Sequence, residues 1–477
     1  MFYKKTILLS SSCSLIGVID MFSKKNKENK YSYEDVSKHN KLNDAWVTYG
    51  KNVYNVTNFI NEHPGGQDKI MLAVGKGLEP YWNTYKQHTN DPDIFNDILK
   101  PMKIGELSDY DPHKYKNTKD PYINDPIRDY RLNFHSTSPC IAETCKNSIM
   151  DNWITPNELW YVRNYHPVPN IDINNFELSI FNNDKSLKLS LSEFKKLKTK
   201  KIVSTIQCGG NRRREYNNID KTIGTSLNFG AISTAEWEGV LLRDLLINTK
   251  VTDQDVLEGK IKHIHFEAID GVKISIPAEK AMNIYGDVLI AFKMNGEDIP
   301  KDHGYPLRLI VPGHVGIRNI KWLKSINTSD QEIDGTWQRG ISYKGLPHYI
   351  KDVKKVNLQE IASVQEMPVQ SCIVDVNSSV IKGFAWCGGG RGIVRVDVST
   401  DNGKTWEEAV LKEGKYQNPS RAWAWTFWEL KVKDDLKNKT IICKATDSSY
   451  NIQPEKIENI WNLRGLNNNS WHKIHIK

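Results

Sequence analysis

A polar stretch with three Asp-Pro pairs divides this chain of 477 residues into two parts. The pairs begin at Asp111, Asp120 and Asp125, within residues 108–128. Proline does not continue a helix or donate to a sheet, and it forces the residue before it into extended conformations. We therefore expect a linker over residues 108–128, with separate domains on both sides, as a chain of this length also requires.

The part before the linker predicts a small domain over residues 31–107. The stretch from Trp46 to Val56 alternates like two short strands around the turn Gly50-Lys51-Asn52. Residues 1–30 precede it. They are rich in Lys, Ser and Leu and contain no acidic residue before Asp20, which is typical of an organelle-targeting presequence.

The part after the linker predicts two further domains. Residues 129–343 mix strand-like runs, such as Leu307–Val311, with helix-like runs, such as Leu191–Lys198. From residue 344 to 477 strands prevail, and Asp401-Asn402-Gly403 predicts a hairpin turn. We expect an α+β multidomain protein whose last domain is an immunoglobulin-like β-sandwich.

Composition excludes several classes of protein. The net charge of +8 is modest, and the basic residues form no long tract and no nucleic-acid-binding motif. The seven Cys residues are odd in number, widely spaced and without a CxxC pair, so neither a disulfide framework nor a zinc site is expected.

Two histidines in the first domain are candidate ligands. His63 is followed by Pro64-Gly65-Gly66, where the backbone turns tightly and can approach a flat ligand closely, and His88 follows 25 positions later. Imidazoles on both faces of a haem iron leave no open position, which suits electron transfer. On the residues alone, a structural role for both histidines stays open.

Cys208 lies in the most informative segment of the chain. A strand-like run, Ser204–Gln207, leads to Cys208-Gly209-Gly210, and Arg212, Arg213 and Arg214 follow. Neighbouring guanidinium groups favour the thiolate, which binds metals, and arginines hold oxyanions bidentately. On the residues alone, Cys208 is a metal ligand, an activated nucleophile or an inert thiol beside a basic turn.

Resemblance to known families chooses among these alternatives. Residues 31–107, down to Ile104-Gly105-Glu106-Leu107, resemble the cytochrome b5 domain, which implies a haem b bound by His63 and His88. Residues 129–343 resemble the molybdopterin-binding domain of sulfite oxidases and plant-type nitrate reductases. The matching segments are 155–164, 204–215, 294–296, 302–308 and 318–323.

The resemblance also implies the residues of a molybdenum site, one cofactor per subunit. Cys208 would bind molybdenum beside the dithiolene sulfurs, and three arginines, Arg163, Arg213 and Arg464, would form an anion pocket. The implied pterin and phosphate contacts are Tyr161, Val162, Arg163, Asn164, Tyr165, Asp270, His303, Arg308, Asn319, Ile320 and Lys321.

Three positions depart from the family pattern, and all belong to the expected pocket wall. The loop before Ser275 is short and lacks the usual Tyr. Leu227 stands where a Trp is usual. Tyr165 replaces the His of Arg-Asn-His, and His166 comes one position later. We expect the metal ligand and the cations to be kept and the hydrogen bonding of the pocket to be altered.

The function implied by the resemblance is that of the sulfite oxidase family. Sulfite would be oxidised to sulfate, and the electrons would pass through the haem to cytochrome c. The protein would be a homodimer joined by its C-terminal domain, in the mitochondrial intermembrane space. One alternative is a nitrate reductase-like enzyme, although that family places its haem domain after the sandwich. The other is a degenerate haem electron-transfer protein, which the missing Tyr and Trp would explain.

Overall fold

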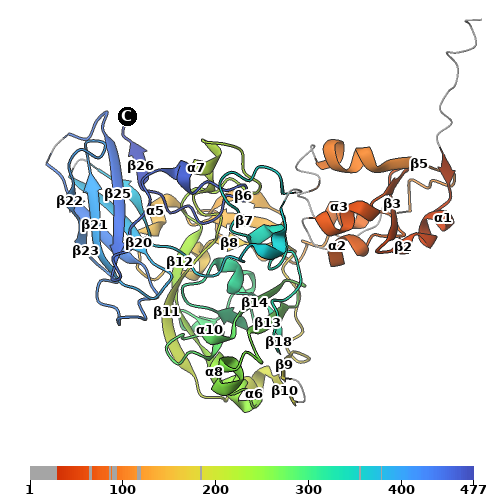
Figure 1. The fold of residues 1–477 in the computed structure, drawn as a ribbon, viewed down its shortest axis with the longest axis horizontal. Coiled ribbons are helices and arrows are strands. Elements are labelled where there is room, and N and C mark those ends of the chain that lie inside the picture. The colour runs from red at the N-terminus through yellow and green to blue at the C-terminus, as the bar shows by residue number, and fades with distance from the viewer. Residues whose placement is uncertain are drawn as a thin grey trace, which may run out of the picture. The chain divides into compact units, whose positions relative to one another are not determined.

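The computed structural model describes residues 29–63, 67–84, 88, 94–114, 120–182, 185–353, 356–377, 379–433 and 435–477 (Figure 1). The expected targeting segment, apart from its last two residues, and the Pro64-Gly65-Gly66 turn lie outside these residues. The chain forms two compact units. The first covers Met1–Asn61, Asp68–Trp82 and Asp91–Thr118, and the second covers the remainder, including Lys119–Lys477.

The first unit is built on a five-stranded sheet in the order β1-β5-β4-β3-β2. Its strands are β1 (Lys30–Tyr31), β2 (Asn40–Lys41), β3 (Asp44–Tyr49), β4 (Asn52–Asn55) and β5 (Lys103–Leu107). The pairing of Tyr49 with Asn52 places the β3–β4 turn where the sequence predicted it. Val47, Tyr54 and Trp82 are buried in its core, and α1 (Tyr33–Lys38) begins at a Ser32–Asp35 capping box.

The helices of the first unit are short. α2 (Gln67–Met71) and α3 (Glu79–Thr84) fall largely within it, and a π-helical turn covers Ile94–Leu99. The described residues of the expected linker, 108–114 and 120–128, form turns and extended chain without helix or strand, as their Asp-Pro pairs predict. None of the helices in the described ranges has the length and apolarity needed to cross a membrane.

The second unit begins with a mixed α/β region of three sheets. Their strand orders are β10-β9-β18-β13-β14, β11-β12-β15-β16 with β17 beside β15, and β6-β7-β8. The strands are β6 (Asn133–Thr137), β7 (Cys140–Glu143), β8 (Val162–Arg163), β9 (Glu177–Asn182), β10 (Lys185–Ser190), β11 (Lys200–Gln207), β12 (Ile232–Leu241), β13 (His263–Ala268), β14 (Lys273–Pro277), β15 (Leu289–Met294), β16 (Glu297–Asp298), β17 (Arg308–Ile310) and β18 (Leu323–Ser329).

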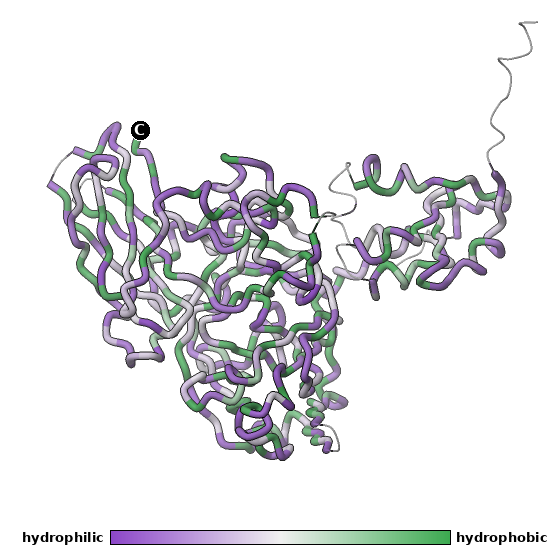
Figure 2. The backbone as a smooth tube through the Cα atoms, viewed as in Figure 1, coloured by the Kyte–Doolittle hydropathy of each residue, from purple (hydrophilic) through white to green (hydrophobic). Residues whose placement is uncertain are grey.

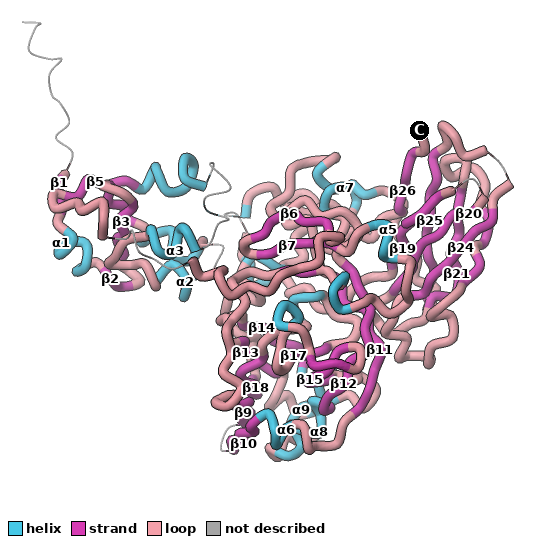
Figure 3. Tube along the Cα trace, turned by 180° about the vertical axis from the view of Figure 1, so that it is seen from behind, coloured by secondary structure: helices cyan, strands magenta, loops and turns pink. Residues whose placement is uncertain are grey.

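Short helices lie among and beside these sheets (Figure 3). They are α5 (Lys146–Ile149), α6 (Leu191–Phe194), α7 (Arg213–Asn217), α8 (Leu242–Asn248), α9 (Asp253–Leu257) and α10 (Ala278–Met282). A helix-like run was predicted over residues 191–198, but the helix that forms, α6, ends at Phe194 and is half as long. Ser190 and Glu193 cap its start, but the chain turns after Phe194, which is fully buried, to enter β11 at Lys200.

The last region is a β-sandwich of two four-stranded sheets, β19-β20-β24-β23 and β22-β21-β25-β26. The strands are β19 (Gln370–Val376), β20 (Val380–Trp386), β21 (Ile393–Ser399), β22 (Glu407–Glu408), β23 (Val410–Leu411), β24 (Thr426–Lys431), β25 (Thr440–Asp447) and β26 (His472–His475). Hydrophobic and hydrophilic residues are interleaved along these strands (Figure 2), and Asn402 and Gly403 adopt positive φ in the predicted turn.

Candidate active site

β11 carries Cys208 to the edge of a buried cavity in the second unit. The strand ends at Gln207, and the backbone N–H of Cys208 donates to the carbonyl of Ala231, 2.9 Å away, at the start of β12. β11 is also fixed to the sandwich, since Thr205 N donates to Trp423 O at 3.0 Å. Cys208 is 7% exposed. It is therefore held by two layers of the fold. The strand that leads to Cys208 was predicted from the sequence, and β11 confirms it.

The segment around β8 presents alternate side chains to this cavity. Tyr161, Arg163 and Tyr165 line it, as the period of two in extended chain requires. Val162 faces away and packs against Leu132, Cys140 and Ala142. Asn164 also lies outside the lining, but its side chain accepts a hydrogen bond from Lys321, so it acts on the cavity through that lysine.

The cavity is lined by side chains from several distant segments of the second unit. Of the expected cofactor residues, the lining includes Tyr161, Arg163, Tyr165, Cys208, Asp270, His303, Arg308, Asn319, Ile320 and Lys321. Sequence reasoning missed Trp160, Val272, Asp302, Gly316, Ile317, Trp322 and Tyr343. Several of these belong to the matching segments, whereas Tyr343 had no signal of its own.

One end of the cavity carries two cations, neither of which forms an ion pair with a carboxylate among the described residues. Arg308 is buried and donates through one terminal nitrogen to the carbonyl of His303 at 3.0 Å. Burial lowers the pKa of Arg308 to about 10, and its Nε has no hydrogen-bond partner in the described chain. Burial also lowers the pKa of Lys321 to about 7. This end is electrostatically incomplete and suits a phosphate.

The charge of Asp302 acts on Lys321, but its carboxylate oxygens are bound by other residues. Arg128 binds both of its carboxylate oxygens, at 2.7 and 2.9 Å, and Asn164 donates to it at 2.9 Å. Burial alone would raise the pKa of Asp302, but the hydrogen bond and charge of Arg128 hold it below its usual value. Asp302 thus anchors the residues that hold Lys321 in place.

The three expected pocket arginines lie near the Cys208 end, but only Arg163 lines the cavity. Arg213 donates from its guanidinium to the carbonyls of Arg464, Gly465 and Thr225 at 2.9 to 3.2 Å. Burial lowers the pKa of Arg464 to about 10, and the neighbouring charge of Arg213 adds to this effect.

Glycines bring Arg213 and the sandwich together. A methyl group added at Gly210 would lie 2.7 Å from the Arg213 guanidinium, and one at Gly465, where φ is +56°, would lie 2.6 Å from Arg213 Cγ. A side chain at either position would displace Arg213, and the positive φ of Gly465 adds backbone strain. The loop that carries Arg464 therefore lies directly against the segment that follows Cys208.

None of the three arginines forms an ion pair with a carboxylate in the parts of the chain that the structure describes. Arg163 donates to the carbonyl of Asn164 at 2.6 Å, and the Nε of Arg464 has no hydrogen-bond partner in the described chain. Buried cations without a counter-charge are costly unless an anion completes the site. The cluster therefore suits an oxyanion.

The two other departures from the family pattern also lie at this site. Leu227 is buried in one apolar cluster with Cys208 and Tyr161. The turn between β13 and β14 is short, and it contributes Asp270 and Val272 to the lining instead of a Tyr. Leu227 lies outside the lining, whereas the short turn brings the carboxylate of Asp270 into the cavity.

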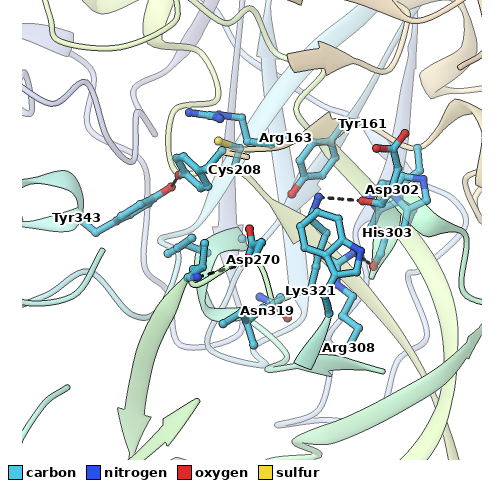
Figure 4. Close-up of a pocket in the computed structure, with 17 residues that line it drawn as sticks. Tyr161, Arg163, Cys208, Asp270, Asp302, His303, Arg308, Asn319, Lys321 and Tyr343 are labelled. Carbon is cyan, nitrogen blue, oxygen red and sulfur yellow. Dashed lines mark hydrogen bonds between the residues drawn. The ribbon is translucent and has the colours of Figure 1, made fainter. Parts of the chain in front are cut away.

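The cavity fits a molybdopterin. Cys208 lies with Arg163 at one side, whereas Arg308 and Lys321 lie at the other (Figure 4). A molybdopterin has its dithiolene sulfurs at one end and its phosphate at the other. The thiol can bind the metal, and the unpaired Nε of Arg308 can bind the phosphate.

The spacing of His63 and His88 fits two ligands of one haem iron. Their ring centroids lie 6.2 Å apart, with the rings inclined by 26°. Two imidazoles on opposite faces of one iron would have centroids roughly 6 Å apart, given metal–nitrogen bonds of about 2 Å. The pair is therefore spaced for one metal ion between the rings.

Comparison with known proteins finds three domain families in the chain. The cytochrome b5-like heme/steroid binding domain matches residues 32–108, the oxidoreductase molybdopterin binding domain 165–337, and the Mo-co oxidoreductase dimerisation domain 354–477. The solved sulfane dehydrogenase SoxCD of Paracoccus pantotrophus shares the fold, with a TM-score of 0.59 and 23% identity over 81% of this chain and 99% of that one.

Curated relatives extend over nearly the whole chain. Mitochondrial sulfite oxidase of Rattus norvegicus is 42% identical, covering 94% of this chain and 84% of that protein. Sulfite oxidase of Gallus gallus is 39% identical, covering 93% and 99%. A nitrate reductase of Phaseolus vulgaris is 32% identical, but the match covers only 41% of it.

Fold, site and domain families together define a molybdenum-dependent oxidoreductase that holds molybdopterin and haem. Its C-terminal domain belongs to a dimerisation family, so the enzyme forms a homodimer. The chain belongs to the sulfite oxidase family.

Proposed function

We propose that this enzyme oxidises sulfite to sulfate at a molybdenum bound by Cys208, and passes the electrons through a haem held by His63 and His88 to cytochrome c. The observation that carries the proposal is the cluster of Arg163, Arg213 and Arg464 beside Cys208, which lacks an acidic partner in the described chain. Sulfite is a small anion, and such a cluster is what its binding requires.

The oxidation of sulfite with water yields sulfate, two protons and two electrons. Molybdenum, when bound, supplies the transfer of oxygen and accepts the electrons. The chain itself supplies binding and orientation. Arg163 holds an anion at the cavity wall, Arg213 and Arg464 add positive charge behind it, and the apolar packing around Leu227 excludes water. Arg308 and Lys321 would hold the cofactor's phosphate.

We place this reaction in the mitochondrial intermembrane space, where cytochrome c is available as an acceptor. Curated relatives named as mitochondrial support the mitochondrial location, and the basic, hydroxyl-rich composition of residues 1–30 agrees with import. Fractionation of mitochondria with a protease-protection assay tests the compartment.

The direct test of the proposed function is a steady-state assay of purified enzyme whose molybdenum content has been measured. Sulfite should reduce cytochrome c, and the haem absorbance should report the reduction. Nitrate offered with a reduced donor is the matched assay for the alternative function. A molybdenum-loaded enzyme that reduces no cytochrome c with sulfite would contradict the proposal.

Replacing Arg163 by Met should raise the KM for sulfite by about 10- to 100-fold, because a charge-assisted contact to the anion is lost while the side-chain volume is roughly kept. The kcat should fall less than kcat/KM. Arg243→Met is the matched control. Arg243 lies outside the cavity lining, and its guanidinium pairs with the Asp253 carboxylate at 2.6 Å. An unchanged KM in Arg163→Met would remove Arg163 from the anion site.

Replacing Lys321 by Met should lower the molybdenum content of purified enzyme by about tenfold, because a phosphate contact disappears. The same change should alter the pH dependence of stability. In the cofactor-free protein burial lowers the pKa of Lys321 to about 7 from an ordinary 10.5. Between these values the unfolded chain binds more protons, so stability rises with pH.

The Lys321→Met variant should lose this rise in thermal unfolding temperature between pH 7 and 10, whereas Lys324→Met should keep it. Lys324 is exposed on β18 and serves as the matched control. Equal molybdenum contents in Lys321→Met and wild type would show that Lys321 does not hold the cofactor.

A further inference from the structure

The last residues of the expected linker are held firmly on the second unit. Tyr122 is buried, and the Asp125 carboxylate accepts a hydrogen bond from the backbone N–H of Val168 at 3.0 Å. The side chain of Arg128 is only 10% exposed. All of this segment precedes residue 165, where the match to the molybdopterin-binding family begins. The end of the linker therefore packs as part of the molybdopterin-binding region.

The guanidinium of Arg128 holds two carboxylates from distant segments. It donates to both oxygens of Asp302, at 2.7 and 2.9 Å, and to Asp125 at 2.7 Å. A planar guanidinium suits this two-bond geometry, which a lysine cannot reproduce. Burial alone would lower the pKa of Arg128, but the hydrogen bonds to Asp302 and Asp125 and the charge of Asp302 outweigh burial and raise the pKa above its ordinary value. Arg128 therefore stays charged and neutralises Asp302.

Asp302 connects Arg128 to the cationic end of the cavity. Its carboxylate accepts a hydrogen bond from the Asn164 side chain at 2.9 Å, and its backbone carbonyl accepts one from Lys321 Nζ at 2.8 Å (Figure 4). The Asn164 side-chain oxygen also accepts from Lys321. This oxygen faces the lysine only while the NH2 group of Asn164 faces Asp302, so the carboxylate fixes the orientation of the amide. The contacts thus run from Arg128 through Asp302 and Asn164 to Lys321.

Without Arg128, the charge of Asp302 would compete with the cofactor for Lys321. Both residues line the cavity, and the negative charge of Asp302 acts on Lys321. A buried carboxylate that has lost its cation is costly, so the freed Asp302 would pair with the lysine ammonium beside it. The phosphate would then meet Arg308 alone.

We propose that Arg128 is a positioning residue of the molybdopterin site, which binds Asp302 and so keeps Lys321 available to the phosphate of the cofactor. The end of the linker thereby belongs to the site that retains molybdenum. This inference rests on the proposed placement of the phosphate at Arg308 and Lys321. It adds a residue that lies outside the cavity lining and acts through Asp302.

The test measures molybdenum and pterin per mole of purified full-length protein. Replacing Arg128 by Met should lower both contents by about tenfold, the effect expected when the partner of a metal-site residue is lost. Adding Asp302→Asn to the same chain should restore both contents to within about threefold of wild type, because the two changes are coupled. Asparagine keeps an oxygen that accepts from Asn164, but it has no charge with which to pair with Lys321.

Arg131→Met is the matched control from the same segment. Arg131 is exposed, and its guanidinium pairs with the Asp129 carboxylate at 2.6 Å, so this variant should hold molybdenum as wild type does. A wild-type molybdenum content in Arg128→Met would overturn the inference. So would a double variant that holds as little molybdenum as Arg128→Met, because Arg128 would then only pack the segment.

Folding and activity are separated from this outcome. If Arg128→Met does not fold, the double variant and Arg128→Lys, which keeps a positive charge beside Asp302, decide by the same measurement, and a low molybdenum content in both would overturn the inference. If wild type holds molybdenum but does not oxidise sulfite, the proposed function fails, while the molybdenum contents still decide the role of Arg128.

Discussion

Replacing Cys208 by Ser is expected to reduce sulfite-dependent cytochrome c reduction by at least about 100-fold. Loss of a residue that only supports a metal ligand costs 10- to 100-fold in many metal sites, and loss of the thiolate itself should cost no less. The cavity offers no second thiol among its lining residues. Serine keeps the shape of the side chain, so the change tests the sulfur rather than the packing.

The haem provides the internal control for this variant. His63 and His88 are separate from Cys208 in sequence and chemistry, so the haem spectrum of Cys208→Ser should equal that of wild type. Cys145→Ser is the matched substitution, since Cys145 is a partly buried thiol outside the cavity lining and should leave activity unchanged. Substantial sulfite oxidation by Cys208→Ser would remove the thiol from the reaction.

Local patterns predicted the parts of the site that lie within one strand or segment. The run into Cys208 became β11. All five residues from Tyr161 to Tyr165 were expected at the cofactor, but extended chain places only every second side chain in the cavity. The turn at Asn402 and Gly403 and the antiparallel pairing of β3 with β4 were likewise predicted, because turn residues and period-two alternation are short-range signals.

Contacts between distant segments were beyond such patterns. Nothing near Tyr343 in the sequence indicates that its hydroxyl meets that of Tyr165, because the contact depends on how a turn near residue 341 docks on another layer. Three arginines were expected to surround one anion, but only Arg163 of the three lines the cavity. Arg213 is bound to carbonyls of the loop at Arg464, a geometry set by glycines in two separate segments.

The short loop before Ser275 shows why a departure from a family pattern does not decide function by itself. Its missing Tyr, together with the missing Trp, motivated the alternative of a degenerate protein when the sequence was considered alone. In the structure the cavity still holds a thiol, a facing arginine and three phenols from other segments, those of Tyr161, Tyr165 and Tyr343. A site is defined by the groups that reach it in space, so a role lost in one segment can be supplied from another.

Replacing His63 by Ala should abolish sulfite-dependent reduction of cytochrome c, with a fall of at least about 100-fold, by removing one of the two haem ligands. The b-type haem spectrum should be lost or shifted, because a single imidazole leaves an iron position open. Oxidation of sulfite by a small artificial oxidant such as ferricyanide should continue within about twofold, because Cys208 and the arginines remain intact.

His113→Gln is the matched control, since His113 is exposed and should leave both assays unchanged. The comparison separates the two redox centres by their acceptors. If His63→Ala lost activity with both acceptors while keeping its molybdenum, the two sites would not be independent. If His63→Ala kept full cytochrome c reduction, the electrons would not pass through a haem bound by His63 and His88. The 6.2 Å between the two ring centroids fits an iron bound by both imidazoles, and the variant has only one of them.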